Sequence, residues 1–209
     1  MSADGPGADV RVLLADDENL VRSAVAGLLD LQDGIVVVGQ AASGPEAIAV
    51  ARKVTPDVAV LDLQMPGADG LAVAEAVHAH VPGCRTMIVT SHGRPGYLKR
   101  ALELGVRGFL PKTASGAVLA DAIRTVARGG RYVDPELAAD AIAAGESPLT
   151  PREADVLELA ADGASVEEIA VKVSLSPGTV RNHLSAATGK LGAANRHEAV
   201  VTARRLGWI

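Results

Sequence analysis

The chain has 209 residues, of which 48% are hydrophobic and 22% are charged, and its formal net charge is -5. This length suffices for one large or two small domains with a buried core. No apolar run approaches the roughly 20 residues that a membrane-spanning helix needs, and the polar, acidic residues 1–9 do not resemble a signal peptide. We therefore expect a cytoplasmic protein with no membrane segment and a disordered tail at 1–9. The single cysteine, Cys84, is consistent with a reducing compartment.

The charges are distributed unevenly between the two halves of the chain. Residues 148–209 hold seven basic and seven acidic residues, so residues 1–147 hold 20 − 7 = 13 basic and 25 − 7 = 18 acidic ones. Within 175–209, five basic residues face Glu198 alone. An acidic front and a basic end indicate that the two halves bind different partners.

The first half alternates strand-like and helix-like segments. Near-continuous apolar strands such as VAVL and MIV indicate a sheet that is buried on both faces. Five such βα units predict an α/β domain at 10–130, with a five-stranded parallel sheet and helices on both sides. The predicted strands are 10–16, 35–41, 57–62, 85–90 and 108–111, and the predicted helices are 19–30, 44–53, 69–79, 96–104 and 114–129.

The second half has a helical pattern only. Residues 131–147 combine a short helical pattern that starts at a proline with Gly145–Pro148, and we interpret them as an interdomain linker. From 148 to 209 the capping signals of Thr150, Ser165 and Ser176 open three helices, and a fourth is expected at about 195–206. The short segment between the second helix, 166–172, and the third, 177–190, gives helix-turn-helix spacing. An all-α four-helix domain is the prediction.

Several of the predicted strands end in residues suited to a metal-phosphate site. Asp16 and Asp17 end the first strand, Asp62 the third, Thr90 the fourth and Lys112 the fifth. Ligands of parallel sheets bind beyond the carboxyl ends of the strands, so these residues should converge. A Mg²⁺ ion takes about six oxygens, which carboxylates, water, a phosphate and a backbone carbonyl can provide. We expect Asp16, Asp17, Asp62 and the carbonyl of Gln64 to hold it.

The turn after Asp62 reads Gln64-Met65-Pro66-Gly67 and would leave the carboxylate accessible. A carboxylate beside Mg²⁺ can attack a phosphoryl group and form an acyl phosphate. Thr90 and Lys112 would then bind the phosphoryl oxygens. These residues predict phosphorylation of Asp62.

Two sets of motifs resemble one family in the same order. The segments LLADDENLVR, DVAVLDLQMPGADG, MIVTSH and GVRGFLPKTAS are similar to a CheY-like receiver. LTPREADVLELAADGASVEEIA and LSPGTVRNHLSAATGKLGAANRHEAVVTARRLGWI are similar to a LuxR-type helix-turn-helix. The chain thus resembles two-component response regulators of the NarL/FixJ family, with a tail similar to a DesR-like subgroup. The resemblance implies that Asp62 is the phosphoacceptor, Thr90 the switch hydroxyl and Phe109 the switch aromatic.

By the same resemblance, the helix at 177–190 is the recognition helix. An Arg can pair with guanine and an Asn with adenine in the major groove, and helix N-termini can bind phosphates. Val180, Leu184 and Leu191 are expected in the core. Ser185 stands where a basic residue is common in relatives. The residues expected at the DNA are Ser176, Thr179, Arg181, Asn182, Ser185, Lys190 and Arg196.

The resemblance also implies partners and a regulatory cycle. A sensor histidine kinase, or a small phosphodonor, would phosphorylate Asp62, and phosphorylation would promote a homodimer on promoter DNA. A contact with RNA polymerase is compatible with this reading. The candidate dimer surfaces are 195–206 and the face that includes 19–30 and 114–129. One departure from the family pattern is the Gly/Pro-rich loop at 91–96, where His92 is expected to be a solvated loop residue.

Three alternatives remain open at this point. A Mg²⁺-dependent phosphatase or phosphotransferase could use the same aspartate, although Gln64 stands where haloacid-dehalogenase-type enzymes generally have a second Asp. A quorum-sensing-type regulator would need an aromatic-lined cavity, and the front half has only Tyr97, Phe109 and Tyr132. A receiver that works without phosphate is the third, and the complete acidic pocket argues against it.

Overall fold

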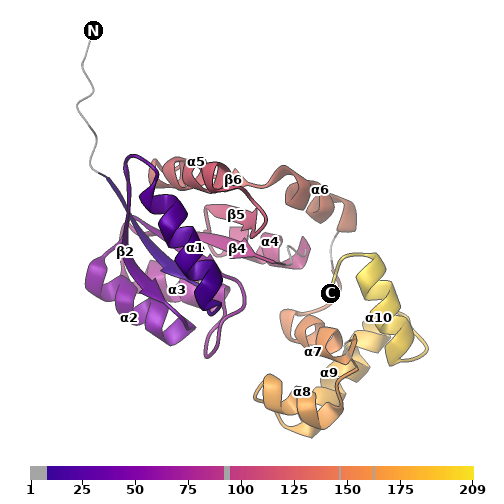
Figure 1. Cartoon of the computed structure of the whole chain (residues 1–209). Coiled ribbons are helices and arrows are strands. Elements are labelled where there is room, and N and C mark those ends of the chain that lie inside the picture. The colour runs from indigo at the N-terminus through magenta and orange to yellow at the C-terminus, as the bar shows by residue number, and fades with distance from the viewer. Residues whose placement is uncertain (1–8, 92–94, 146, 162) are drawn as a thin grey trace. The chain divides into compact units, whose positions relative to one another are not determined.

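The computed structural model describes residues 9–91, 95–145, 147–161 and 163–209 (Figure 1). The predicted tail at 1–9, apart from Asp9, and His92 lie outside the described residues. The chain forms two compact units, one of residues 1–93 and 100–137 and one of residues 94–99 and 138–209. The division after Leu137 falls inside the segment predicted as a linker.

The first unit is built on a parallel sheet in the strand order β2-β1-β3-β4-β5-β6. The first five strands match the predicted ones to within one residue at each end. Their bounds are Val10–Ala15 (β1), Ile35–Ala41 (β2), Val58–Asp62 (β3), Arg85–Thr90 (β4) and Gly108–Pro111 (β5). In this order β1 lies between β2 and β3. It pairs with β3 in parallel, with Val12 beside Val58 and Ala15 beside Leu61.

One strand was missed by the sequence analysis. The prediction of five strands was incomplete, because Tyr132–Val133 (β6) adds a sixth, paired parallel to Gly108 and Phe109 of β5. A segment of two residues is too short for an alternation of apolar and polar positions to be visible in sequence. The helical pattern that follows it forms α6, Pro135–Ala144.

Helices connect the strands and cover both faces of the sheet. One face packs against α1 and α5, through a cluster that includes Val12, Val60, Leu29, Ile123 and Val126, all buried. Among the described helices, none combines the length and apolar character needed to cross a membrane. The helix bounds are Asn19–Asp30 (α1), Gly44–Val54 (α2), Gly70–His80 (α3), Pro95–Glu103 (α4) and Gly116–Ala127 (α5).

The second unit contains the four predicted helices around a separate core. These are Pro151–Ala161 (α7), Val166–Lys172 (α8), Pro177–Lys190 (α9) and Arg196–Arg205 (α10). Val180 and Leu184 of α9 are buried in this core and Leu191 is partly buried, which confirms their predicted role. Ser165 and Ser176 cap α8 and α9 through the backbone N–H groups of Glu168 and Thr179. The only tryptophan of the chain, Trp208, packs against the same core.

An ion pair joins the first and third helices of this unit. Glu153, only 6% exposed, accepts hydrogen bonds from Lys190 Nζ and from the Thr150 backbone N–H, both at 2.7 Å. The Glu153 N–H in turn donates to the Thr150 hydroxyl at 3.3 Å. Burial opposes ionisation, but Lys190 and Thr150 together lower the pKa of Glu153 below its ordinary value.

Gly70 lets the start of α3 lie directly on the end of β3. A Cβ built on Gly70 would stand 2.2 Å from the carbonyl oxygen of Asp62 and 3.2 Å from Ile88 Cδ1. The Gly70 N–H donates to the Leu63 carbonyl at 2.9 Å. Any side chain at this position must therefore displace backbone, which a packed interior accommodates poorly.

We expect Gly70→Ala to destabilise the first unit by about 1–3 kcal/mol, since it overpacks this contact. Gly27→Ala is the matched control, because nothing lies within 4 Å of its added Cβ. Since Gly27 is inside α1, its replacement should be neutral or stabilise by about 0.5–1 kcal/mol. Urea unfolding followed by circular dichroism measures both, and equal stability of the two variants would contradict the steric argument.

The ion pair of Glu153 predicts a pH dependence of the second unit. A carboxylate whose pKa is lowered by folding stabilises the folded state above its unfolded pKa, and this contribution is lost as pH falls through the lowered folded pKa. Glu153→Gln should therefore cost about 1–3 kcal/mol at pH 7 and progressively less as the medium is acidified below pH ~4. Trp208 fluorescence during urea unfolding reports this unit in the full chain. A deficit that stays constant down to the acid range would refute the assignment.

Candidate functional site

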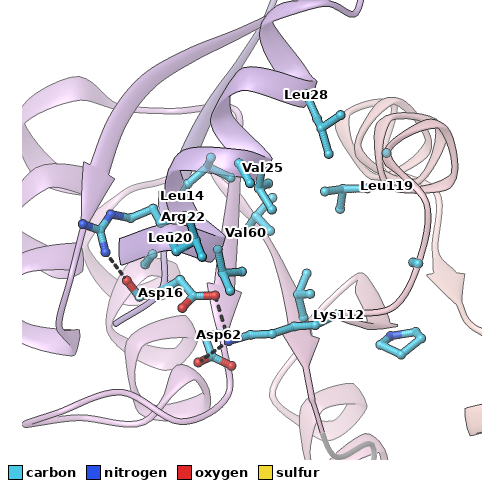
Figure 2. Close-up of a pocket in the computed structure, with 17 residues that line it drawn as sticks. Leu14, Asp16, Leu20, Arg22, Val25, Leu28, Val60, Asp62, Lys112 and Leu119 are labelled. Carbon is cyan, nitrogen blue, oxygen red and sulfur yellow. Dashed lines mark hydrogen bonds and ion pairs between the residues drawn. The ribbon is translucent and has the colours of Figure 1, made fainter. Parts of the chain in front are cut away.

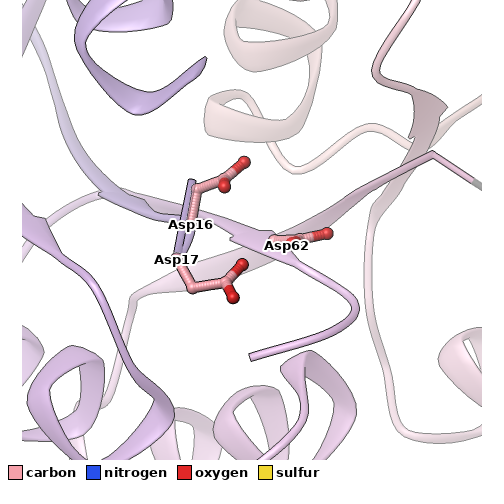
Figure 3. A group of neighbouring side chains, drawn as sticks. All are labelled: Asp16, Asp17 and Asp62. Atoms are coloured by element: carbon pink, nitrogen blue, oxygen red, sulfur yellow. The ribbon is translucent and has the colours of Figure 1, made fainter. Parts of the chain in front are cut away.

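The predicted carboxylates meet at the carboxyl edge of the sheet. Asp16 and Asp17 directly follow β1, and Asp62 is the last residue of the neighbouring β3. One carboxylate oxygen from each of these residues lies within 4.8 Å of the others (Figure 3). Asp16 and Asp62 are buried, whereas Asp17 is exposed. The structure therefore brings together the three acidic residues that the sequence placed at strand ends.

Lys112, one residue beyond β5, is the cation of this cluster. Its Nζ atom lies 2.9 Å from Asp16 Oδ2, 2.9 Å from Glu18 Oε1 and 3.1 Å from Asp62 Oδ2. Figure 2 shows the lysine side chain reaching toward Asp16 and Asp62. The contact with Glu18 was missed by the sequence analysis. Its only signal was its place one residue after the Asp16-Asp17 pair.

The electrostatics of the cluster follow from burial and from this lysine. Burial raises the pKa of Asp62, and the Asp16 carboxylate acts in the same direction, while Lys112 and the Gln64 backbone N–H oppose them. The net result is a pKa above the ordinary value. Burial alone would lower the pKa of Lys112, but its hydrogen bonds to Asp16, Glu18 and Asp62 raise it above the ordinary value. Lys112 thus stays a cation at any physiological pH.

The excess of negative charge suits a hard divalent cation. Among the described residues, the carboxylates of Asp16, Asp17, Asp62 and Glu18 outnumber the nearby cations, which are the Lys112 ammonium and the Arg22 guanidinium that donates to the Asp16 backbone carbonyl. Like charges at this spacing repel, and oxygen ligands of this kind bind small hard cations. The donor set therefore fits a metal ion, which Asp16, Asp17 and Asp62 could hold together.

The remaining predicted residues of this site lie nearby but differ in exposure. Thr90, the last residue of β4, is 2% exposed, and its carbonyl accepts a hydrogen bond from the Lys112 backbone N–H at 2.8 Å. Phe109 in β5 is fully buried. Gln64 is exposed in the turn after β3, and its role as a carbonyl ligand stays a prediction.

A cavity of about 320 Å³ opens beside the cluster, between α1 and the start of α5 (Figure 2). Its lining is mostly apolar, including Val25, Leu28, Val60 and Leu119, and its polar end is formed by Asp62 and Lys112. The adjoining surface of α1 is also apolar. Leu20 and Leu28 of α1 are 83% and 47% exposed, and Leu31, which follows the helix, is 79% exposed. Exposed apolar side chains that lie together often mark an interaction surface.

The predicted DNA-binding residues lie mainly on the exposed side of α9. Arg181, Asn182 and Ser185 are exposed, and Ser176 Oγ lies 2.8 Å from Thr179 Oγ1 at the helix start. Arg196 is exposed at the start of α10. Lys190 differs from the others, because its ammonium is paired with the buried Glu153. Its predicted contact with a DNA phosphate therefore competes with a bond inside the unit.

Two family models match the chain. Residues 12–124 match the response regulator receiver domain, and residues 147–203 match the bacterial regulatory proteins of the luxR family. The transcriptional regulatory protein DesR of Bacillus subtilis is 41% identical over 96% of this chain and 99% of its own length. The probable transcriptional regulatory protein NarL of Mycobacterium tuberculosis is 36% identical, with 94% of each chain covered.

Solved structures agree with these matches. The response regulator ChrA of a heme-sensing two-component system is 33% identical over 97% of this chain and all of its own, with a TM-score of 0.57. RcsB in a complex with DNA is 27% identical over 94% of this chain and 98% of its own, with a TM-score of 0.62. The front half is thus a receiver and not the ligand-binding domain of a quorum-sensing regulator. The chain belongs to the two-component response regulators of the NarL/FixJ type, which join a receiver domain to a LuxR-family DNA-binding domain.

Proposed function

We propose that a sensor histidine kinase, or a small phosphodonor such as acetyl phosphate, phosphorylates Asp62 of this regulator. The observation that carries the proposal is the position of Asp62: its carboxylate lies at the end of a buried strand, 3.1 Å from Lys112 and within reach of two further carboxylates. A group of carboxylates with a lysine at the carboxyl ends of parallel strands suits a divalent cation and a phosphoryl group bound together.

The proposed reaction is a transfer of one phosphoryl group. A carboxylate oxygen of Asp62 attacks the phosphorus, the bond from phosphorus to the kinase histidine breaks, and an acyl phosphate forms. Mg²⁺, with Asp16, Asp17, Asp62 and the carbonyl of Gln64 as proposed ligands, supplies positive charge to the phosphoryl oxygens when bound. Lys112 is placed to exchange its bond to Asp62 for one to the new phosphoryl group.

The proposed response to phosphorylation runs through Thr90 and Phe109. The phosphoryl group offers oxygen acceptors that the free carboxylate lacks, and the Thr90 hydroxyl is the proposed donor to them. The backbone bond between Lys112 and Thr90 couples β4 to β5 at this point. Such a switch shifts the population between two states, so it requires that the phosphoryl group binds one of them more tightly.

We further propose that the phosphorylated state dimerises and binds promoter DNA in the cytoplasm. The exposed leucines Leu20, Leu28 and Leu31 support the face of α1 and α5 as a dimer surface, and α10 remains the candidate in the second unit. A single helix-turn-helix makes few base contacts, so two half-sites are needed for affinity. A contact with RNA polymerase would follow from promoter binding.

Asp62→Ala should abolish Mg²⁺-dependent labelling by acetyl phosphate and the accompanying rise in dimer, because the attacking oxygen is lost. Asp57→Asn is the control, since Asp57 precedes the same strand at its opposite end and accepts from the Arg11 backbone N–H. Intact-protein mass spectrometry gives the stoichiometry, and analytical ultracentrifugation gives the mass in solution. Unchanged labelling of the Asp62 variant would refute the phosphoacceptor assignment.

Arg181→Gln should weaken binding to the preferred DNA site by about 1–3 kcal/mol, because the proposed pairing with guanine is lost. Arg131→Gln removes the same charge from an exposed residue of the first unit and should leave the preference for this site unchanged. Fluorescence anisotropy with a duplex selected from a randomised library measures both. If the two variants lose affinity equally, α9 does not read bases through Arg181.

A further inference from the structure

The guanidinium of Arg181 is bound by a carboxylate from the neighbouring helix. Arg181 NH2 lies 3.2 Å from Glu167 Oε1, so the pair joins α9 to the first turn of α8. The arginine side chain is 61% exposed and the glutamate side chain 66% exposed. The pair therefore lies on the surface that, under the proposed function, faces DNA.

Glu167 differs from its neighbour in what it does for α8. Glu168 closes the capping box of the helix, because its carboxylate accepts from the Ser165 backbone N–H at 2.8 Å while the Ser165 hydroxyl accepts from the Glu168 N–H at 3.2 Å. Glu167 instead reaches across to α9. A carboxylate on a DNA-facing surface is unfavourable for binding in general, since it repels phosphates.

The ion pair contributes little free energy, so DNA can compete with Glu167 for the Arg181 guanidinium. Exposed ion pairs change an equilibrium constant by about five-fold at most. A guanidinium has five N–H donors, and a guanine takes two of them in a bidentate contact. Arg181 can therefore bind a guanine and keep a donor on Glu167. When Arg181 turns to a phosphate instead, the negative charge of the phosphate lies beside the Glu167 carboxylate and is repelled by it, whereas the edge of a guanine is neutral.

We propose that Glu167 is a specificity-determining residue, which orients Arg181 toward base edges and penalises complexes in which Arg181 binds only phosphate. This inference rests on the proposed role of α9 in DNA binding. Glu167 does not touch a base in this scheme. It acts through Arg181, and its effect is expected mainly on DNA that lacks the preferred sequence.

The test compares two duplexes of equal length with the full-length phosphorylated chain. One duplex carries the preferred sequence selected from a randomised library, and the other carries the same bases shuffled. Glu167→Gln should tighten binding to the shuffled duplex about two- to five-fold and change binding to the preferred duplex less than about two-fold. Asp140→Asn, which removes the same charge from an exposed residue of α6, should leave the ratio of the two affinities unchanged.

The outcomes separate this inference from the proposed function. If Glu167→Gln changes both affinities by the same factor, or neither, the inference is overturned. If Arg181→Gln leaves the preference between the duplexes intact, the proposed role of Arg181 in reading bases is refuted, whatever the Glu167 variant does. Urea midpoints from Trp208 fluorescence check folding, and a second variant, Glu167→Ala, must reproduce the loss of preference for the inference to stand.

Discussion

The receiver half depends on one compensated cluster of charge at the end of its sheet. Asp16 and Asp62 are both buried, and without a cation their mutual repulsion would oppose folding. Lys112 provides that cation and contacts both, together with Glu18. Because Asp16 follows β1, Asp62 ends β3 and Lys112 follows β5, these contacts also connect the three strands at their carboxyl ends. The same arrangement leaves a buried carboxylate in contact with an ammonium group, which under the proposed function would bind the incoming phosphoryl group.

The second unit also contains a buried carboxylate, that of Glu153, which is paired with a lysine. Its core contains mainly alanine, valine and leucine side chains, and a small core buries little apolar surface. The pair of Glu153 and Lys190 adds a polar connection between the start of α7 and the end of α9. This bond helps to hold the end of α9 against α7, and its strength depends on both partners staying charged. The ion pair of Arg181, near the start of α9, is longer and more exposed to solvent than that of Lys190, which suits the exchange of partners that we propose for Arg181.

Most of the fold could be predicted from the sequence, because its patterns are long and consistent. The five longer strands and the four helices of the second unit have apolar repeats and caps that leave few alternatives. β6 could not be predicted, since two residues carry no period. The members of the acidic cluster followed from strand ends, whereas Glu18 and Glu167 did not. In the sequence alone nothing distinguishes these two glutamates from others. Only the folded chain shows that Glu18 binds Lys112 and that Glu167 binds Arg181.

The short strand β6 gives the connection between the two halves a defined starting point. The Tyr132 N–H donates to the carbonyl of Arg107, just before β5, and the N–H of Asp134, just after β6, donates to the carbonyl of Phe109 in β5. The beginning of the connecting segment is therefore hydrogen-bonded to the strand that holds Phe109 and precedes Lys112. Any shift of β5 that followed the proposed phosphorylation would reach residues 132–134 through these backbone hydrogen bonds, without a helix in between.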